Sequence, residues 1–344
     1  MRWFPVVMIA ACLIVTPSLL GGRARAGEPV SKYDLQRRVA DAARLLASHP
    51  RMKGMSEAQR EKHVEFVAGN LLFVLGHEAG HAAISDMGIP VVGREEDAAD
   101  IFATLMALMC TDGFADRVLA NAALGWFYSD RRDRRDRPLG AEAAAYYDGH
   151  GMDLQRAYTV VCLMVGSNMG KFASVAQAAR LPAERQTTCQ DDYLNAKWSW
   201  DQVLQSHLRK ADEPRTAINI VYGPGNGQYD AYAAVARQMK ILEAMADHLS
   251  DHFVWRAPLS LEMQSCGDAN ARFEFRTKKV IVCYELAEEF SELYRRYGRS
   301  MAFSLDEKVA SATPHRDSEK VLAVKPRRDS SRNRKSFGAK RAGR

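Results

Sequence analysis

The feature that most constrains this chain is an H-E-x-x-H sequence, His77 to His81, set inside an apolar run. The run and the small residues between the histidines favour a helix, and residues four apart on a helix share one face. His77 and His81 can therefore present two imidazole nitrogens to one metal ion. Glu78 is displaced by about 100° around the helix, where its carboxylate reaches a metal-held water and not the metal. This arrangement is that of a zinc hydrolase, and it makes peptide-bond hydrolysis the leading hypothesis.

The segments around the motif predict two antiparallel helices joined by a short connection. Ser56 followed by Gln59 is a capping-box pattern at the start of the first helix. Gly88 and Pro90 end this helix, because glycine terminates and proline cannot continue it. A second helix is predicted over 94–110. The pair can place acidic residues of the second helix opposite the two histidines of the first.

A third metal ligand is expected from the start of this second helix. Catalytic zinc takes three protein ligands and leaves a fourth position for water. Glu96 would bind the metal, and Asp100, one turn further on, can accept a hydrogen bond from the free ring nitrogen of His77, which fixes the tautomer and ring orientation. Glu95 and Asp97 point roughly 100° away on either side of Glu96 and are the less favoured alternatives.

The expected cofactor is one Zn²⁺ ion. A metal lowers the pKa of its bound water to about 7, so a hydroxide-like nucleophile exists at neutral pH. Glu78 would act as the general base, taking the proton of the water and passing it to the leaving amine. The metal ligands expected from the sequence are His77, His81 and Glu96.

Histidines outside the motif are weaker candidates. His150 lies between two glycines, after Tyr146 and Tyr147. A peptidase of this type needs a group that stabilises the tetrahedral oxyanion, and His150 or either tyrosine could supply it. A structural or surface position for His150 is an equally good interpretation. His248 and His252 also have i, i+4 spacing, but charges on the same face favour a solvated helix.

The two ends of the chain differ from its body. Residues 1–26 have a basic start, an apolar stretch and Ala24-Arg25-Ala26, which is the pattern of a cleaved signal peptide. This pattern predicts an exported protein, periplasmic or secreted, with no transmembrane segment after cleavage. Residues 27–305 then form the folded domain. Residues 306–344 are polar and basic, which predicts a disordered tail.

Positive charge is concentrated in that tail. From Lys308 to Arg344 there are twelve lysines and arginines against three acidic residues, although the formal charge of the whole chain is only +6. Clustered basic residues bind anions electrostatically, so contact of the tail with an anionic surface is one interpretation. Only Phe337 interleaves the basic residues, and we expect no specific nucleic-acid partner. The expected partner is a peptide or protein substrate.

Five cysteines remain after the predicted signal peptide, and export would allow them to form disulfides. Cys266 and Cys283 flank two short strand-like runs joined by a polar turn, so a hairpin would bring their sulfurs together. Cys162 with Cys189 is a weaker second pair. Cys110 would then be the cysteine without a disulfide partner. No C-x-x-C spacing occurs, which argues against a cysteine metal site.

The remaining patterns predict a predominantly helical α+β domain with a small β-hairpin element. Besides the hairpin, we expect a strand over 216–222 and helices over 141–166, 232–253 and 285–297. The run of mixed charge over 129–138 is expected to be a solvated loop.

Several stretches carry a resemblance to known proteins: Leu75–His81, Arg94–Asp100, Gly149–Arg156, Ser265–Ala271 and Val282–Leu286. H-E-x-x-H with a downstream Glu and a helping Asp resembles the gluzincin branch of zinc metallopeptidases. More closely, the chain is similar to an uncharacterised bacterial family of exported proteins classed as metallopeptidases. The resemblance implies a zincin-like domain with zinc on His77, His81 and Glu96 and with Glu78 catalytic. It implies no particular substrate.

The leading interpretation is an exported zinc-dependent endo- or aminopeptidase. One alternative is a hydrolase of cell-wall peptide amides. Another is a zinc-binding envelope or secreted interaction protein without turnover. Glu78 separates these classes, since a protein that only binds zinc has no need of a general base.

Overall fold

The computed structural model describes residues 34–110, 113–136, 149–299, 302–303 and 305. The predicted signal peptide, the basic tail, Tyr146 and Tyr147 lie outside these residues. The described residues fall within one unit of the chain by their contacts, Met1–Ala310. None of the described helices combines the length and the apolar character that a membrane span requires.

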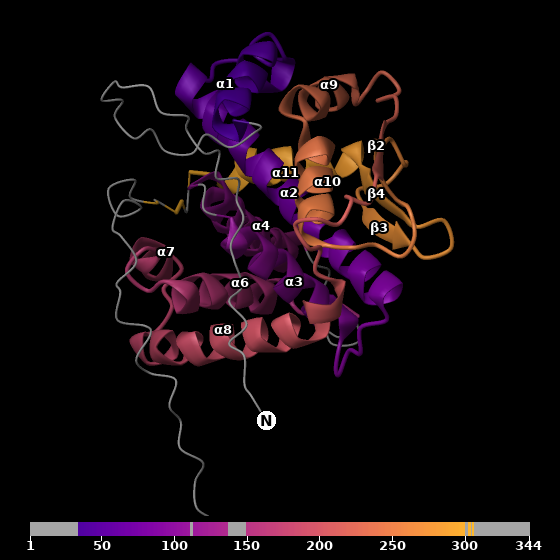
Figure 1. Cartoon of the computed structure of the whole chain (residues 1–344). Coiled ribbons are helices and arrows are strands. Elements are labelled where there is room, and N and C mark those ends of the chain that lie inside the picture. The colour runs from indigo at the N-terminus through magenta and orange to yellow at the C-terminus, as the bar shows by residue number, and fades with distance from the viewer. Residues whose placement is uncertain (1–33, 111–112, 137–148, 300–301, 304, 306–344) are drawn as a thin grey trace, which may run out of the picture. The chain divides into compact units, whose positions relative to one another are not determined.

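The fold is predominantly helical with one four-stranded sheet, which confirms the predicted fold class (Figure 1). The helices are α1 (Leu35–Leu45), α2 (Glu57–Met87), α3 (Glu95–Met109), α4 (Gly113–Asp136), α6 (Asp153–Ser167), α7 (Ala173–Ala178), α8 (Ala183–Leu204), α9 (Asp230–Met239), α10 (Ile241–His252) and α11 (Tyr284–Tyr297). The strands are β1 (Ile218–Tyr222), β2 (Leu259–Gln264), β3 (Ala271–Glu274) and β4 (Lys279–Cys283).

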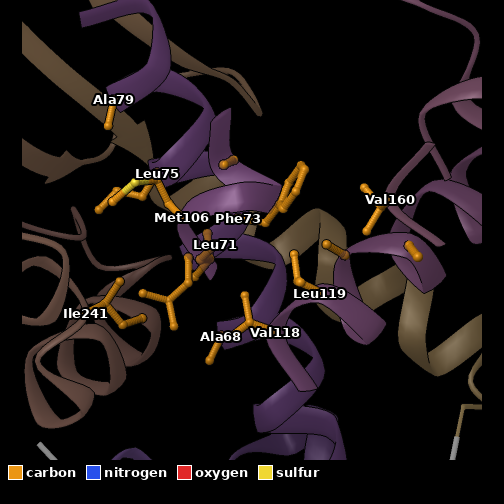
Figure 2. Packing of buried hydrophobic residues seen from close by; sticks show 14 of the residues in the cluster. Ala68, Leu71, Phe73, Leu75, Ala79, Met106, Val118, Leu119, Val160 and Ile241 are labelled. Carbon is orange, nitrogen blue, oxygen red and sulfur yellow. The ribbon is translucent and has the colours of Figure 1, made fainter. Parts of the chain in front are cut away.

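Helix α2 is the centre of the core, and it begins and ends as the sequence predicts. The Ser56 hydroxyl accepts from the Gln59 backbone N–H, and the Gln59 side chain accepts from the Ser56 N–H. At the other end Gly88 adopts the left-handed conformation with φ 67°. Most of α2 is buried, because α1, α3, α4, α10 and α11 all pack on it. Figure 2 shows Leu71 and Leu75 of α2 among side chains of its neighbours.

The sheet has the strand order β1-β2-β4-β3. Strands β1, β2 and β4 are parallel, whereas β3 runs antiparallel to β4, and these two strands form the predicted hairpin. Strand β3 therefore lies at an edge of the sheet, and it packs beside α2. At the turn of the hairpin, Lys278 Nζ donates to Ser85 Oγ of α2 at 3.0 Å. The open edge of the sheet is thus attached to the helix that carries the H-E-x-x-H sequence.

Both predicted disulfides are confirmed. Cys162–Cys189 joins α6 to α8, and Cys266–Cys283 closes the hairpin. Cys110 belongs to neither of them.

Two predicted elements are wrong, and a third begins later than expected: of the helix predicted over 141–166, residues 149–152 are not helical and α6 begins at Asp153. Residues 129–136 are not a loop but the last turns of α4, where Arg134 pairs with Asp130 one turn away and Arg132 pairs with Glu289 of α11. The expected helix over 232–253 is two helices, α9 and α10, because Lys240 takes a left-handed conformation with φ 53° between them. Strand β2, helices α7 and α8 and residues 113–128 of α4 were not predicted.

Candidate metal centre

The candidate centre lies where α2 passes the first turn of α3. Two glycines of α2 permit the close approach of the helices. A Cβ atom at Gly80 would lie 3.0 Å from Ala99 Cα, and one at Gly76 would lie 3.3 Å from Ala103 Cβ. Because Gly76 and Gly80 are one turn apart, they form a smooth stripe beside His77 and His81. The acidic start of α3 consequently lies directly against the two histidines.

Three expected ligand atoms converge at this contact. His77 Nε2 lies 3.1 Å and His81 Nε2 lies 3.4 Å from Glu96 Oε2. The two Nε2 atoms are 3.2 Å from each other. Ligands held at 2.0–2.1 Å around a tetrahedral zinc ion are about 3.3 Å apart. The donor set and its spacing therefore fit one such ion.

The other ring nitrogen of each motif histidine faces a carboxylate of α3. His77 Nδ1 lies 2.8 Å from Asp100 Oδ1, and His81 Nδ1 lies 2.8 Å from Glu95 Oε1. A proton on Nδ1 donates to these oxygens, which leaves Nε2 as the lone-pair donor towards the centre. Asp100 and Glu95 thus orient the two imidazoles so that each presents Nε2 to the centre.

Asp100 is held in turn by an arginine of α6. Arg156 donates to Asp100 through Nε at 2.7 Å and Nη2 at 2.8 Å. The guanidinium carbon lies 3.7 Å from the centre of the Trp126 ring, within range of a cation–π interaction. Both members of the ion pair are almost completely buried. Arg156 therefore compensates the buried charge of Asp100 and links α6 to the contact with His77.

Glu78 contacts the edge strand and also lies near the charges of His77, His81 and Glu96. Its carboxylate accepts a hydrogen bond from the backbone N–H of Phe273 in β3. The backbone carbonyl of Asn270 accepts from the Cys283 N–H. Because hydrogen-bonded and non-hydrogen-bonded pairs alternate along an antiparallel ladder, the backbone N–H and carbonyl of Phe273 point away from β4. Burial raises the pKa of Glu78, against the opposing charges of the nearby histidines. A carboxylate in this setting is a better proton acceptor than an exposed one.

His150 also reaches the centre. Its Nε2 lies 3.0 Å from Glu96 Oε2, while its backbone carbonyl accepts from Arg94 Nη1 at 3.4 Å. The His150 side chain is 51 % exposed, in contrast to the motif histidines, which are largely buried. The structure therefore brings His77, His81, Glu96 and His150 together.

The electrostatics of the centre favour positive charge. Burial opposes protonation of His81, but its hydrogen bonds to Glu96 and Glu95 outweigh burial and raise its pKa to about 9. The pKa of Glu96 is held far below its usual range by hydrogen bonds from His150, His77 and His81, in that order. Without a metal, protons on the imidazoles supply the positive charge that the carboxylates require, and a divalent cation can take their place.

Three residues of the centre were not assigned a position by the sequence: Arg156, Phe273 and Glu95 as a partner of His81. Arg156 falls in the stretch 149–156 that carries the family resemblance, which was the available signal. Glu95 was considered only as a rival metal ligand. Nothing in the local sequence indicates the contact of Phe273, because it depends on how the sheet packs against α2.

Two other clusters among the described residues do not form comparable sites. Cys266, Cys283 and Glu285 lie close enough for a metal, but the cysteines form a disulfide and Glu285 accepts from backbone N–H groups of the adjoining loop. The expectation that His248 lies on a solvated face is wrong. Burial lowers its pKa to about 3, and its Nδ1 lies 3.8 Å from Cys110 Sγ.

Comparison with known proteins identifies a family. A family model described as "Putative metallopeptidase" matches residues 42–204 and 223–316, which include every residue of the candidate centre. No curated protein and no solved structure matches the chain significantly.

Proposed function

The chain belongs to this metallopeptidase family, and on that premise we propose that it is an exported, zinc-dependent peptidase that uses His77, His81 and Glu96 as metal ligands. The observation that carries the proposal is the convergence of the two Nε2 atoms on Glu96 Oε2, with the buried carboxylate of Glu78 beside them. Export is supported by the two disulfides, which persist in oxidising compartments.

The chemistry divides between the metal and the chain. A bound zinc ion would lower the pKa of a coordinated water to about 7 and polarise the substrate carbonyl. Glu78 takes a proton from the attacking water and passes it to the leaving amine, which is the task its raised pKa suits. The hydrogen bond from Phe273 N–H fixes the carboxylate orientation during both transfers. Asp100 and Glu95 keep the imidazoles in the tautomer that donates from Nε2.

The edge strand supports a peptide as the substrate. Strand β3 has no strand partner on its outer side among the described residues. The main-chain carbonyl of Phe273 faces outward beside the N–H that donates to Glu78, and an extended peptide can add to such an edge through carbonyl and amide groups that Glu78 does not use. A peptide bound there lies next to Glu78. In this proposal His150, at the exposed side of the centre, donates to the oxyanion that develops on the carbonyl.

A peptide library distinguishes this proposal from its alternatives. The purified protein should cleave linear peptides, a chelator should stop the cleavage, and added zinc should restore it. Cleavage confined to cell-wall peptide amides would assign the alternative hydrolase. Stoichiometric zinc without Glu78-dependent cleavage of either substrate would leave a zinc-binding protein and contradict the peptidase.

A further inference from the structure

A third histidine approaches the same oxygen atom as the two motif histidines. His150 Nε2 is 3.0 Å from Glu96 Oε2, against 3.1 and 3.4 Å for His77 and His81. The ligand atoms of His77, Glu96 and His150 all lie within 4.8 Å of one another. The distances from Glu96 Oε2 to His77 Nε2 and His81 Nε2, and the distance between these two nitrogens, match those between ligand atoms of a tetrahedral zinc ion. His150 Nε2 is a further potential ligand atom beside the same Glu96 oxygen.

The backbone around His150 is attached to the helix that carries Glu96. Arg94, just before α3, donates to the His150 carbonyl oxygen and also pairs with Asp97. A few residues further along, Arg156 binds Asp100. The segment 150–156 therefore follows the first two turns of α3, with contacts at both ends. The position of His150 at the centre is a consequence of this attachment.

His150 differs from the other ligands in how firmly it is held. His77, His81 and Glu96 belong to long helices packed in the core. His150 lies outside any helix, two residues before the N-cap of α6, and half of its side chain is exposed. A Cβ atom at the preceding Gly149 would meet nothing within 4 Å. Rotation of the backbone there can withdraw the imidazole without disturbing a helix.

Four protein ligands would close the centre. Structural zinc sites are closed in this way, whereas catalytic sites keep one position for water or substrate. A closed centre has no need of a buried general base, yet Glu78 lies beside it with its carboxylate hydrogen-bonded to the edge strand. Both observations are satisfied if one ligand is removable, and His150 is the ligand whose removal costs least.

We propose that His150 is a fourth, displaceable ligand that closes the zinc centre in the resting protein and leaves it to make room for the attacking water when a substrate group binds the metal. The inference rests on the proposed function, because it requires the metal on His77, His81 and Glu96. Once displaced, the imidazole is next to the substrate carbonyl and can donate to the oxyanion. The resting centre thus has no position for a metal-bound water until a substrate group competes with His150.

X-ray absorption at the zinc edge tests the resting state directly. The zinc-loaded protein is expected to show three imidazoles and one carboxylate oxygen, and His150→Ala should show two imidazoles. His207→Ala, which changes a histidine outside the centre, should retain three. Two imidazoles in the unaltered protein would overturn the inference, because His150 would then only donate a hydrogen bond to Glu96.

Displacement is tested with acetohydroxamate as a metal-binding probe. At saturation it should reduce the imidazole count of the unaltered protein from three to two. His150→Ala should bind acetohydroxamate more tightly, by about tenfold or more, because no closed state competes with the probe. Equal affinities of the two proteins, or a count that stays at three, would contradict displacement.

The outcomes separate this inference from the proposed function. Two imidazoles with Glu78-dependent cleavage would reject the closed centre and keep the peptidase. Three imidazoles that no probe displaces, without any cleavage, would reject the peptidase and displacement together and identify a structural zinc site. Loss of zinc from His77→Ala with full binding in His150→Ala is expected in either case and shows that the metal occupies this centre.

Discussion

Arg156 donates two hydrogen bonds, at 2.7 and 2.8 Å, to the buried carboxylate of Asp100, whose Oδ1 also lies 2.8 Å from His77 Nδ1. The orientation of His77, a proposed metal ligand on α2, thus depends on an arginine of α6, although neither Arg156 nor Asp100 belongs to the proposed ligand set. Mutation of a residue that hydrogen-bonds to a metal ligand commonly lowers the affinity for the metal by about 10–100-fold.

Replacing Arg156 should therefore weaken zinc binding. Arg156→Met leaves the Asp100 charge buried without compensation, which costs about 3–5 kcal/mol of folding stability and disturbs the hydrogen bond to His77. We expect zinc affinity to fall by about 10–100-fold, as measured by competition with a chromogenic chelator. Arg156→Lys keeps the charge and should recover part of the affinity.

A matched variant separates loss of zinc affinity from loss of stability. Lys171 pairs with the buried Asp116 at 2.6 Å, away from the centre. Lys171→Met should lower the free energy of unfolding while leaving zinc affinity unchanged. If the two variants lost zinc affinity in proportion to their stability, Arg156 would have no specific effect on the centre.

Gly80 should tolerate no side chain. A Cβ atom there would lie 3.0 Å from Ala99 Cα and 3.3 Å from its carbonyl oxygen, both backbone atoms that cannot move alone. We expect Gly80→Ala to cost about 1–3 kcal/mol and to reduce zinc affinity by displacing the start of α3. Gly170→Ala, whose nearest neighbour would be a side-chain atom at 3.7 Å, is the control. Chemical denaturation and zinc titration of both variants check this, and an unaffected Gly80→Ala would show that the helices can separate freely.

The sequence predicted the helices of the centre well because their signals are local. The capping box at Ser56, the stop at Gly88 and the acidic first turn of α3 are each read within a few residues. The Cys266–Cys283 disulfide followed from the predicted hairpin, whereas Cys162–Cys189 was only a weaker second pairing. The pairing of Glu95 with His81 was not predicted, because angular spacing alone ignores that side chains in the first turn of a helix lean towards its N-terminus.

Other contacts could not be predicted because they join distant segments. Arg156 and Asp100 are 56 residues apart and meet only because α6 packs on α3. The charged end of α4 resembles a loop in sequence, since its stabilising partners, such as Glu289, belong to α11. The break between α9 and α10 at Lys240 could not be predicted, because no glycine or proline stands there.

His63 makes the fold sensitive to acid. Burial, and to a lesser extent the charge of Arg295, lower its pKa from 6.5 to about 4. Below pH 6.5 His63 takes up a proton in the unfolded chain but stays neutral in the native protein. The free energy of unfolding therefore falls as the pH drops from 6.5 towards 4, and above pH 6.5 this loss is absent. The full loss is about 3 kcal/mol.

Urea unfolding at pH 7 and at pH 4.5 measures this effect. His63 Nε2 lies 2.8 Å from Ser291 Oγ, and His63→Gln can keep a hydrogen bond there without titrating. The variant should lose less stability between the two pH values than the unaltered protein. An identical loss in both proteins would assign the acid sensitivity to other groups.

The backbone N–H of Phe273 can be removed selectively. It faces outward from β3 and donates to Glu78, so Phe273→Pro breaks this hydrogen bond and leaves the ladder to β4 intact. We expect zinc binding to persist and turnover to fall by about tenfold or more, since general-base catalysis contributes about 10²–10⁴. Phe273→Leu retains the N–H and is the control. Equal turnover of the two variants would exclude the backbone contact from the reaction.

The most direct measurement is zinc content and peptide cleavage of Glu78→Gln, determined on one preparation beside the unaltered protein. Glu78 is not a ligand in this account, and glutamine can still accept from Phe273 N–H. We predict one zinc per chain in both proteins and a loss of turnover of at least about 10²-fold in the variant. Undiminished cleavage by Glu78→Gln, or cleavage by a protein that binds no metal, would contradict the account.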